Sequence, residues 1–259
     1  METMMRILAI NVNDLGGKNE QLMKHRYFSN RDQNWHIDWE YWSRLDKTES
    51  WRKLKEYIQK KSPDIFFVEE MLISCFEKIN FIAELKELGY SYIYESLPER
   101  GNYSLTMAFY KSNQNKPRYI ELPENYRKYR SVLCENEGVI FCGSHFPYES
   151  DEVFLKYMYG FFASNLEKEI LLIGDLNAND PERGNKKMVN KLLKKGAVDL
   201  WIAAGNSEDT PTEAKYSGRL DYAIASPLLA RKIQNIEIDP YPMESDMTDH
   251  AAIIVDIKA

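Results

Sequence analysis

The stretch Lys168–Asp180, KEILLIGDLNAND, is the feature that most constrains the fold of this chain. Its first half contains a continuous apolar run, Ile170–Ile173, which is typical of a strand buried on both faces. The run ends at a glycine, and four Asp or Asn residues follow within six positions, which indicates a loop at a strand end. Such a strand would hold Asp175 and Asn177 at an exposed sheet edge, where a carboxylate can take a proton or a cation. An ordinary Asx-rich turn is the alternative from this stretch alone.

The remaining segments predict the architecture. β-rich runs outnumber helical ones, and several follow one another as hairpins do, which favours two mixed sheets packed face to face over a simple parallel sheet. We expect one domain over residues 1–259 with an α/β fold, a four-layer αββα sandwich of two mixed β-sheets with flanking helices. The other predicted strands are Arg6–Val12, Ile65–Val68, Tyr90–Tyr94, Leu105–Tyr110, Tyr129–Cys134, Gly138–Gly143, Arg219–Ser226, Ile233–Ile238 and Ala251–Ile257. The predicted helices are 50–61, 76–88, Phe154–Leu166 and Lys186–Lys195, and Tyr241–Thr248 is predicted to be a loop.

Composition narrows the function classes. The formal net charge is −6, so a nucleic-acid substrate would have to be bound by a local basic patch or through metal ions. The three cysteines stand at unrelated spacings and give neither a zinc pattern nor a disulfide framework. No secretion signal and no apolar run of membrane-spanning length are found, so we expect a soluble, cytoplasmic protein. The sequence does not determine the oligomeric state.

Polar side chains that a hydrophobic core does not need stand at six strand ends. Each is attached to a β-rich run, so a rigid element can hold it at a sheet edge. Their carboxylate and amide oxygens, without a Cys/His cluster, favour Mg²⁺ or Mn²⁺ over zinc. These residues are Asn11, Glu70, His145, Asp175 with Asn177, Asp221, and Asp249 with His250.

The motifs around these strand ends resemble the endonuclease/exonuclease/phosphatase superfamily, the metal-dependent phosphodiesterase fold of deoxyribonuclease I and exonuclease III. They occur in the family's order and span nearly the whole chain. The motifs are RILAINVN at 6–13, PDIFFVEE at 63–70, SHFPY at 144–148, GDLNA at 174–178, RLDYAIAS at 219–226 and TDHAAI at 248–253.

The resemblance implies roles for single residues. A Mg²⁺ site, with Mn²⁺ as an alternative, would involve Asn11, Glu70 and Asp249, whereas Glu69 stands where the family usually has Gln and is expected to be a neighbour of the metal site. Asp175 would orient or deprotonate the attacking water, with Asn177 fixing its geometry. His250, held by Asp221, would be the general base or a donor to a phosphate oxygen. The sequence does not decide whether Asp175 or His250 is the base. The residues with implied catalytic roles are His145, Asp175, Asn177, Asp221 and His250.

The substrate is left more open. Members of the exonuclease III type have Tyr where this chain has His145, and the His form resembles deoxyribonuclease I, neutral sphingomyelinases and inositol polyphosphate phosphatases. We expect a Mg²⁺-dependent hydrolase of phosphodiester bonds in nucleic acid, acting as an endonuclease or exonuclease. A phosphatase or phosphodiesterase for a small phosphorylated metabolite or lipid headgroup is the alternative, which the acidic net charge favours. A catalytically inactive binding module is a further alternative, and the retention of all metal and His positions argues against it.

The segment 18–45 matches no motif of the family. It carries His25, His36 and several aromatic residues, among them Trp35 and Trp39, between charged ones. These aromatic side chains would either form one rim of the cleft or pack on the body of the protein, and we favour packing because it is the commoner use.

Overall fold

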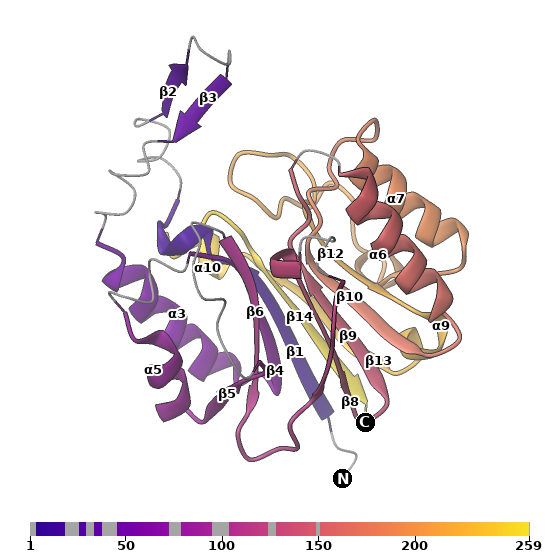
Figure 1. Cartoon of the computed structure of the whole chain (residues 1–259), viewed down its shortest axis with the longest axis horizontal. Coiled ribbons are helices and arrows are strands. Elements are labelled where there is room, and N and C mark those ends of the chain that lie inside the picture. The colour runs from indigo at the N-terminus through magenta and orange to yellow at the C-terminus, as the bar shows by residue number, and fades with distance from the viewer. Residues whose placement is uncertain are drawn as a thin grey trace.

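The computed structural model describes residues 4–18, 26–29, 34–37, 46–72, 79–94, 104–123, 128–148 and 151–258. Two six-stranded sheets pack face to face in it (Figure 1). The first sheet consists, in spatial order, of β13 (Ile233–Asp239), β14 (Ala252–Lys258), β1 (Met4–Asn11), β4 (Ile65–Leu72), β6 (Ser104–Lys111) and β5 (Tyr90–Tyr92). The second consists of β11 (Val198–Asp199), β12 (Asp221–Ala225), β10 (Glu169–Asp175), β9 (Val139–Ser144), β8 (Ser131–Asn136) and β7 (Arg118–Ile120). A separate antiparallel pair is formed by β2 (Arg26–Ser29) and β3 (Asn34–Ile37).

Helices cover the outer faces of both large sheets, which completes four layers (Figure 1). The first sheet is covered by α3 (Thr48–Lys61) and α5 (Phe81–Glu87), and the second by α6 (Glu152–Ser164) and α7 (Gly184–Lys194). The expected αββα sandwich of two mixed sheets is confirmed. None of the helices in the described ranges has both the length and the apolar composition needed to cross a membrane. The shorter helices are η1 (Asn13–Leu15), η2 (Lys128–Arg130), α8 (Leu200–Ala203), α9 (Pro227–Ala230) and α10 (Tyr241–Glu244).

Each large sheet contains one parallel pair of strands. In the first sheet β1 pairs with β4, and in the second β9 pairs with β10, while the other ladders are antiparallel. The parallel strands of each pair are separated in the chain by a covering helix, α3 or α6, as parallel pairing requires. The carboxyl ends of both strands in a pair therefore lie at the same sheet edge.

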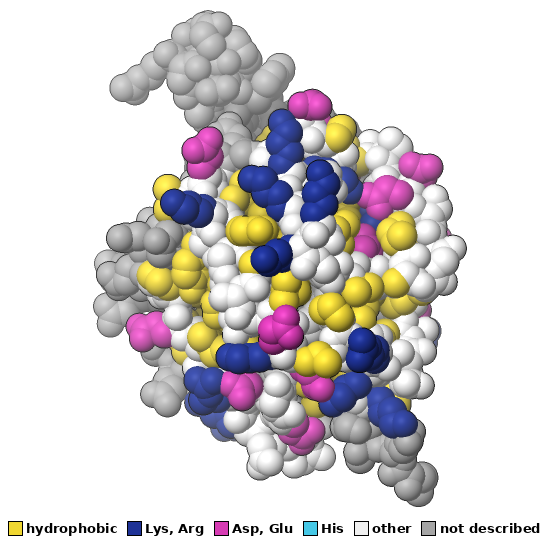
Figure 2. All heavy atoms as spheres, turned by 90° about the vertical axis from the view of Figure 1, so that its right-hand side faces the viewer, with side chains coloured by type: hydrophobic (Ala, Val, Ile, Leu, Met, Phe, Trp, Pro, Cys, Tyr) yellow, Lys and Arg dark blue, Asp and Glu magenta, His cyan; other side chains and the backbone are white. Residues whose placement is uncertain are grey.

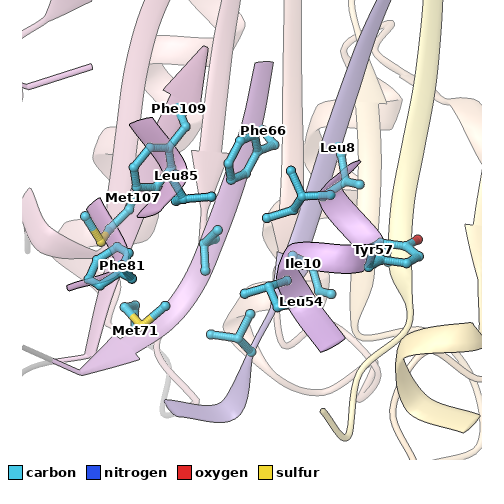
Figure 3. Close-up of a cluster of buried hydrophobic side chains, with 14 of the residues drawn as sticks. Leu8, Ile10, Leu54, Tyr57, Phe66, Met71, Phe81, Leu85, Met107 and Phe109 are labelled. Carbon is cyan, nitrogen blue, oxygen red and sulfur yellow. The ribbon is translucent and has the colours of Figure 1, made fainter. Parts of the chain in front are cut away.

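The apolar strand runs are continuous because both faces of each sheet are covered. In β1, Leu8 and Ile10 belong to the core under α3 and α5, whereas Ile7 and Ala9 belong to the core between the sheets. Figure 3 shows the first of these cores, in which Ile10 lies beside Leu54 of α3 and Leu8 belongs to the same cluster. Because side chains alternate between the two faces of a strand, one apolar run contributes to both cores.

Several predicted segments differ from the structure: β4 continues past Val68 to Leu72, residues 129–130 belong to η2 and not to β8, and two helical segments need correction. The helix expected over 76–88 begins at Phe81, and the described residues before it, 79–80, are not helical. Asn80 occupies the N-cap position, but its side chain makes no capping hydrogen bond. The loop expected over 241–248 contains α10, which begins around a proline at one of its first two positions, where the missing N–H costs nothing. The predicted packing of aromatic side chains in 18–45 lies outside the described residues apart from the backbones of β2 and β3.

Candidate active site

All eight predicted site residues lie at one edge of the two large sheets. A cavity of about 430 Å³ opens there. Asn11 and Asp221 do not line it, but they hydrogen-bond to Asp175 and His250, which do. The structure therefore brings together groups that come from almost the whole length of the chain. The predicted residues that line the cavity are Glu70, His145, Asp175, Asn177, Asp249 and His250.

Asp175 is held from several sides at the end of β10. Its Oδ2 accepts a hydrogen bond from Asn11 Nδ2 at 3.0 Å, and its Oδ1 accepts one from the backbone N–H of Asn177 at 2.9 Å. Asn177 has a φ of 47°, a left-handed conformation that Asn tolerates, and its side chain donates to the Phe146 carbonyl at 3.0 Å. Burial, partly opposed by the nearby His250, raises the pKa of Asp175 to about 7. Its carboxyl group therefore exchanges a proton near neutral pH.

His250 is oriented by Asp221. Its Nδ1 lies 3.0 Å from Asp221 Oδ2, and its Nε2 lies 3.9 Å from Asp175 Oδ2. Burial acts to lower the pKa of His250, but the charge and hydrogen bond of Asp221 outweigh burial and raise it well above its ordinary value. His250 is therefore an imidazolium at neutral pH, with its Nε2–H directed toward Asp175.

His145 is held by Arg130, a residue with no predicted role. Arg130 Nη1 lies 2.8 Å from Nδ1 of His145 and 3.3 Å from Nε2. A guanidinium only donates, so the nearer Nδ1 is the acceptor and the ring proton is on Nε2. That nitrogen lies 3.4 Å from Glu70 Oε1 and 3.6 Å from Asp175 Oδ2. Burial, and then the charge of Arg130, lower the pKa of His145 well below its usual value, so this ring is neutral.

Glu70 enters the cavity through an irregularity of β4. The register against β6 shifts between Val68 and Met71, and Glu70 has a φ of 53°. A bulge of this kind changes the direction of a side chain, and a left-handed non-glycine residue is strained, a combination that is frequent at functional sites. Burial, followed by the charges of Asp14 and Asp249, raises the pKa of Glu70 to about 8.

Glu69 lies on the inner side of the same irregularity. It is completely buried, and its Oε2 accepts a hydrogen bond from the backbone N–H of Asp175 at 2.8 Å. Its Oε1 has no hydrogen-bond partner in the described part of the chain. Burial, then the charge of Asp175, raises the pKa of Glu69 well above its usual value. The contact agrees with the expectation that Glu69 is a neighbour of the metal site, and that role stays a prediction.

Gly174 lies between the carboxyl groups of Glu69 and Asp175. Its replacement by Ala is expected to destabilise the fold by about 2–5 kcal/mol. An added Cβ would lie 2.0 Å from Glu69 Oε1 and 2.5 Å from the Ser144 carbonyl oxygen, and the φ of 134° disfavours a side chain. Denaturant unfolding measures the effect. The control is Gly160→Ala in α6, where nothing lies within 4 Å of the new methyl group. There the change is expected to stabilise by up to about 1 kcal/mol, and equal effects at the two positions would contradict the packing seen around Gly174.

The donors around Glu70 suit a hard cation. They are oxygen atoms, and the repulsion from Asp14 and Asp249 that raises the pKa of Glu70 would be relieved by positive charge. Glu70 and Asp249 would hold such an ion, with Asn11 beside it. The Oδ1 of Asn11 already accepts from the Asn13 backbone N–H at 2.9 Å, although a carbonyl oxygen has a second lone pair. Within the described ranges, no three His, Cys, Asp or Glu side chains form a ready metal-binding group, so the ligand roles stay predictions.

Sequence reasoning assigned no role to several residues that line the cavity. Arg130 precedes β8 in no recognisable motif, and the others lie mainly in the polar loop 206–218. Tyr148 belongs to the SHFPY motif, which is the one pattern that pointed to its position. These residues are Arg130, Tyr148, Glu213, Lys215, Tyr216 and Leu220.

Comparison with known sequences gives one family. The chain matches the Endonuclease/Exonuclease/phosphatase family over residues 26–250. No curated protein matches the sequence.

Solved structures share the fold over nearly the whole chain. An AP endonuclease from Archaeoglobus fulgidus has a TM-score of 0.69 at 14% identity and covers 98% of this chain and 100% of its own. A 3'-5' exonuclease, NExo, from Neisseria meningitidis has a TM-score of 0.68 at 16% identity with the same coverage. A 3' phosphatase NExo variant from Neisseria, bound to a product DNA hairpin, has a TM-score of 0.68 at 14% identity, again covering 98% and 100%. At these identities the likeness establishes the fold, and the substrate has to be argued from the site.

Proposed function

Because the chain belongs to the endonuclease/exonuclease/phosphatase family, we propose that this phosphoesterase is a Mg²⁺-dependent enzyme that hydrolyses phosphodiester bonds in nucleic acid. The main support for this proposal is that two histidine rings lie close to the carboxyl group of Asp175. The Nε2 atoms of His145 and His250 lie 3.6 and 3.9 Å from its Oδ2, so the Asp175 carboxyl group and two N–H donors lie together at one cavity. A phosphodiester resists hydrolysis because its anionic oxygens repel nucleophiles, and donors directed at those oxygens counter that repulsion.

The Asp175 carboxylate and the two imidazole rings would have separate tasks. Asp175 would take the proton of the attacking water, because a pKa of about 7 lies near the working pH. His250, charged through Asp221, would donate its Nε2–H to a phosphate oxygen, and the neutral His145 would donate to another. When bound at Glu70, Mg²⁺ would supply positive charge against the phosphate and the leaving oxygen.

We also propose that residues 1–259 form one domain. The pairing of β1 with β14 supports this, because it joins the first and last described strands in one sheet.

The local distribution of charge supports nucleic acid as the substrate, although the formal net charge of the chain is −6. A groove between α6 and α7 is lined by Lys156, Lys187 and Lys191 together with Glu152 and several apolar side chains. Figure 2 views the side of the molecule that carries these helices, and Lys and Arg side chains gather on its upper part. A local group of cations can bind phosphates independently of the overall balance. Asn185, in the first turn of α7, donates to the carbonyls of Leu176 and Asn177, so this helix begins beside the cavity.

A small phosphorylated molecule is the second candidate. The cavity of about 430 Å³ has the size of small-molecule sites. This candidate shares all the catalytic residues and differs only in what lies beyond the reacting phosphate.

The two candidates are separated by parallel assays in Mg²⁺. Plasmid nicking and cleavage of short oligonucleotides are compared with phosphate release from a panel of phosphorylated metabolites. Cleavage of nucleic acid is expected. Phosphate release without cleavage of either the plasmid or the oligonucleotides, even at high enzyme concentration, would reverse the ranking. Nucleic-acid binding without hydrolysis of any substrate would instead support an inactive binding module.

A further inference from the structure

Two exposed tyrosines stand beside the catalytic cavity and have no part in the chemistry proposed above. Tyr148 and Tyr216 line this cavity together with His145 and His250. The two residues are nevertheless 50% and 41% exposed. Exposed aromatic rings that gather at a site are candidates for ligand contact, because covering them removes apolar surface from water.

Both rings are fixed in position before any ligand arrives. The guanidinium of Arg183 lies 4.2 Å from the ring centre of Tyr148, and its Nη2 donates to the Tyr148 hydroxyl at 3.0 Å. Tyr216 hydrogen-bonds to Tyr148. Its loop is attached to the catalytic edge, because the Ala214 N–H donates to the Asp249 carbonyl at 2.9 Å. A ligand that stacks on these rings would therefore lose little additional side-chain freedom.

Charges of both signs surround the two rings, with Asp180 3.5 Å from Arg183 and Glu213 lining the cavity beside Lys215. Arg183 lies against Tyr148, and Arg130 and Lys215 line the same cavity. Proteins hold single nucleic-acid strands with this pairing of groups, because bases stack on aromatic rings while cations follow the phosphates. A phosphorylated metabolite without an aromatic group would use the cations and leave the rings uncovered.

We propose that Tyr148 and Tyr216, supported by Arg183, form a stacking subsite for the base of the nucleotide next to the scissile phosphate. The inference rests on the proposed function and narrows its substrate to strands whose bases are unpaired or terminal. A base inside a duplex cannot lie on a tyrosine ring until it leaves its own stack. Stacking accepts every base, so the subsite confers no sequence preference.

The test compares a short single-stranded oligonucleotide with the same strand carrying abasic tetrahydrofuran residues. Tyr148→Ala and Tyr216→Ala are each expected to raise KM for the intact strand by about tenfold, with little change in kcat. Neither variant is expected to change KM for the abasic strand, since the base that stacks is absent. Tyr148→Phe retains the ring and is expected to retain most of the affinity. The matched control is Tyr241→Ala, a tyrosine 47% exposed on α10 and outside the cavity, for which both KM values should be unchanged.

The outcomes separate this inference from the proposed function. An equal rise of KM on both strands would overturn the stacking subsite and indicate a phosphate contact or a structural role. Unchanged KM values in both alanine variants, with both strands still cleaved, would also overturn it and leave the proposed function intact. Failure of the unaltered enzyme to cleave either strand, together with phosphate release from a metabolite, would overturn both.

Discussion

Replacing Asp175 by Asn is expected to lower kcat for phosphodiester cleavage by roughly 10²–10⁴-fold. The carboxylate is the only group in the proposed mechanism that accepts the proton of water, and an amide cannot take that role. Steady-state kinetics at saturating substrate and Mg²⁺ measure the loss. Circular dichroism and thermal unfolding establish that the variant is folded, because one carboxylate oxygen that accepts from Asn11 or Asn177 becomes an NH₂ group.

The matched control for this substitution is Asp180→Asn on the same loop. Asp180 Oδ1 accepts from the Glu182 backbone N–H at 2.9 Å, and Asn can retain this turn. Its kcat is expected to stay within about twofold of the unaltered enzyme. If Asp175→Asn were as active as Asp180→Asn, Asp175 could not be the base, and His250 would take its place in the mechanism.

Mg²⁺ is expected to raise the melting temperature more at pH 8 than at pH 6, and Glu70→Gln is expected to abolish this difference. The pKa of Glu70 in the metal-free fold is about 8, against about 4.3 for an exposed Glu. The folded protein therefore binds this proton more tightly than the unfolded chain, which gives stability at low pH that is lost as pH rises toward 8. Asp175, with a pKa of about 7, acts with the same sign. Mg²⁺ competes with the proton, so its affinity rises by up to about tenfold per pH unit until the carboxyl is ionised.

Thermal unfolding with Mg²⁺ and with a chelator at both pH values provides a readout that does not depend on activity. Glu182→Gln is the control, since its side chain is 85% exposed and lies outside the cavity. A stabilisation by Mg²⁺ that is independent of pH, or that persists in Glu70→Gln, would place the metal elsewhere.

Much of the fold was predictable because its strands carry simple patterns. A run such as Ile170–Ile173 is apolar at every position since cores lie on both sides of it, Leu172 facing α6 and α7 and Leu171 facing the other sheet. The elements that were missed are short. β7 has three residues and β11 two, and such pieces exist only because a neighbouring strand pairs with them.

The candidate site was predictable as a set of residues and much less so as a set of contacts. The family resemblance implied that Asp221 holds His250, and the structure shows this contact and places Asp175 close to the same ring. The tie between Asn11 and Asp175 joins positions 164 residues apart, and nothing local to either indicates it. Arg130 was missed for the same reason. Its role is to donate a hydrogen bond to the ring of His145, and only the pairing of β8 with β9 brings the two residues together.

The hydrogen bonds at the site have a consequence for how the two halves of the sandwich are aligned. Three of them join the first sheet or its extensions to the second: Asn11 to Asp175, Glu69 to the backbone of Asp175, and His250 to Asp221. The core between the sheets is apolar, and interdigitated side chains such as Phe67 against Gly143 oppose a slide of one sheet over the other. The hydrogen bonds at one edge add directional contacts to that packing. The residues around Asp175 thus also help to fix the translational register of the sandwich, so a change in inter-sheet packing would alter the spacing between Glu70 and Asp175.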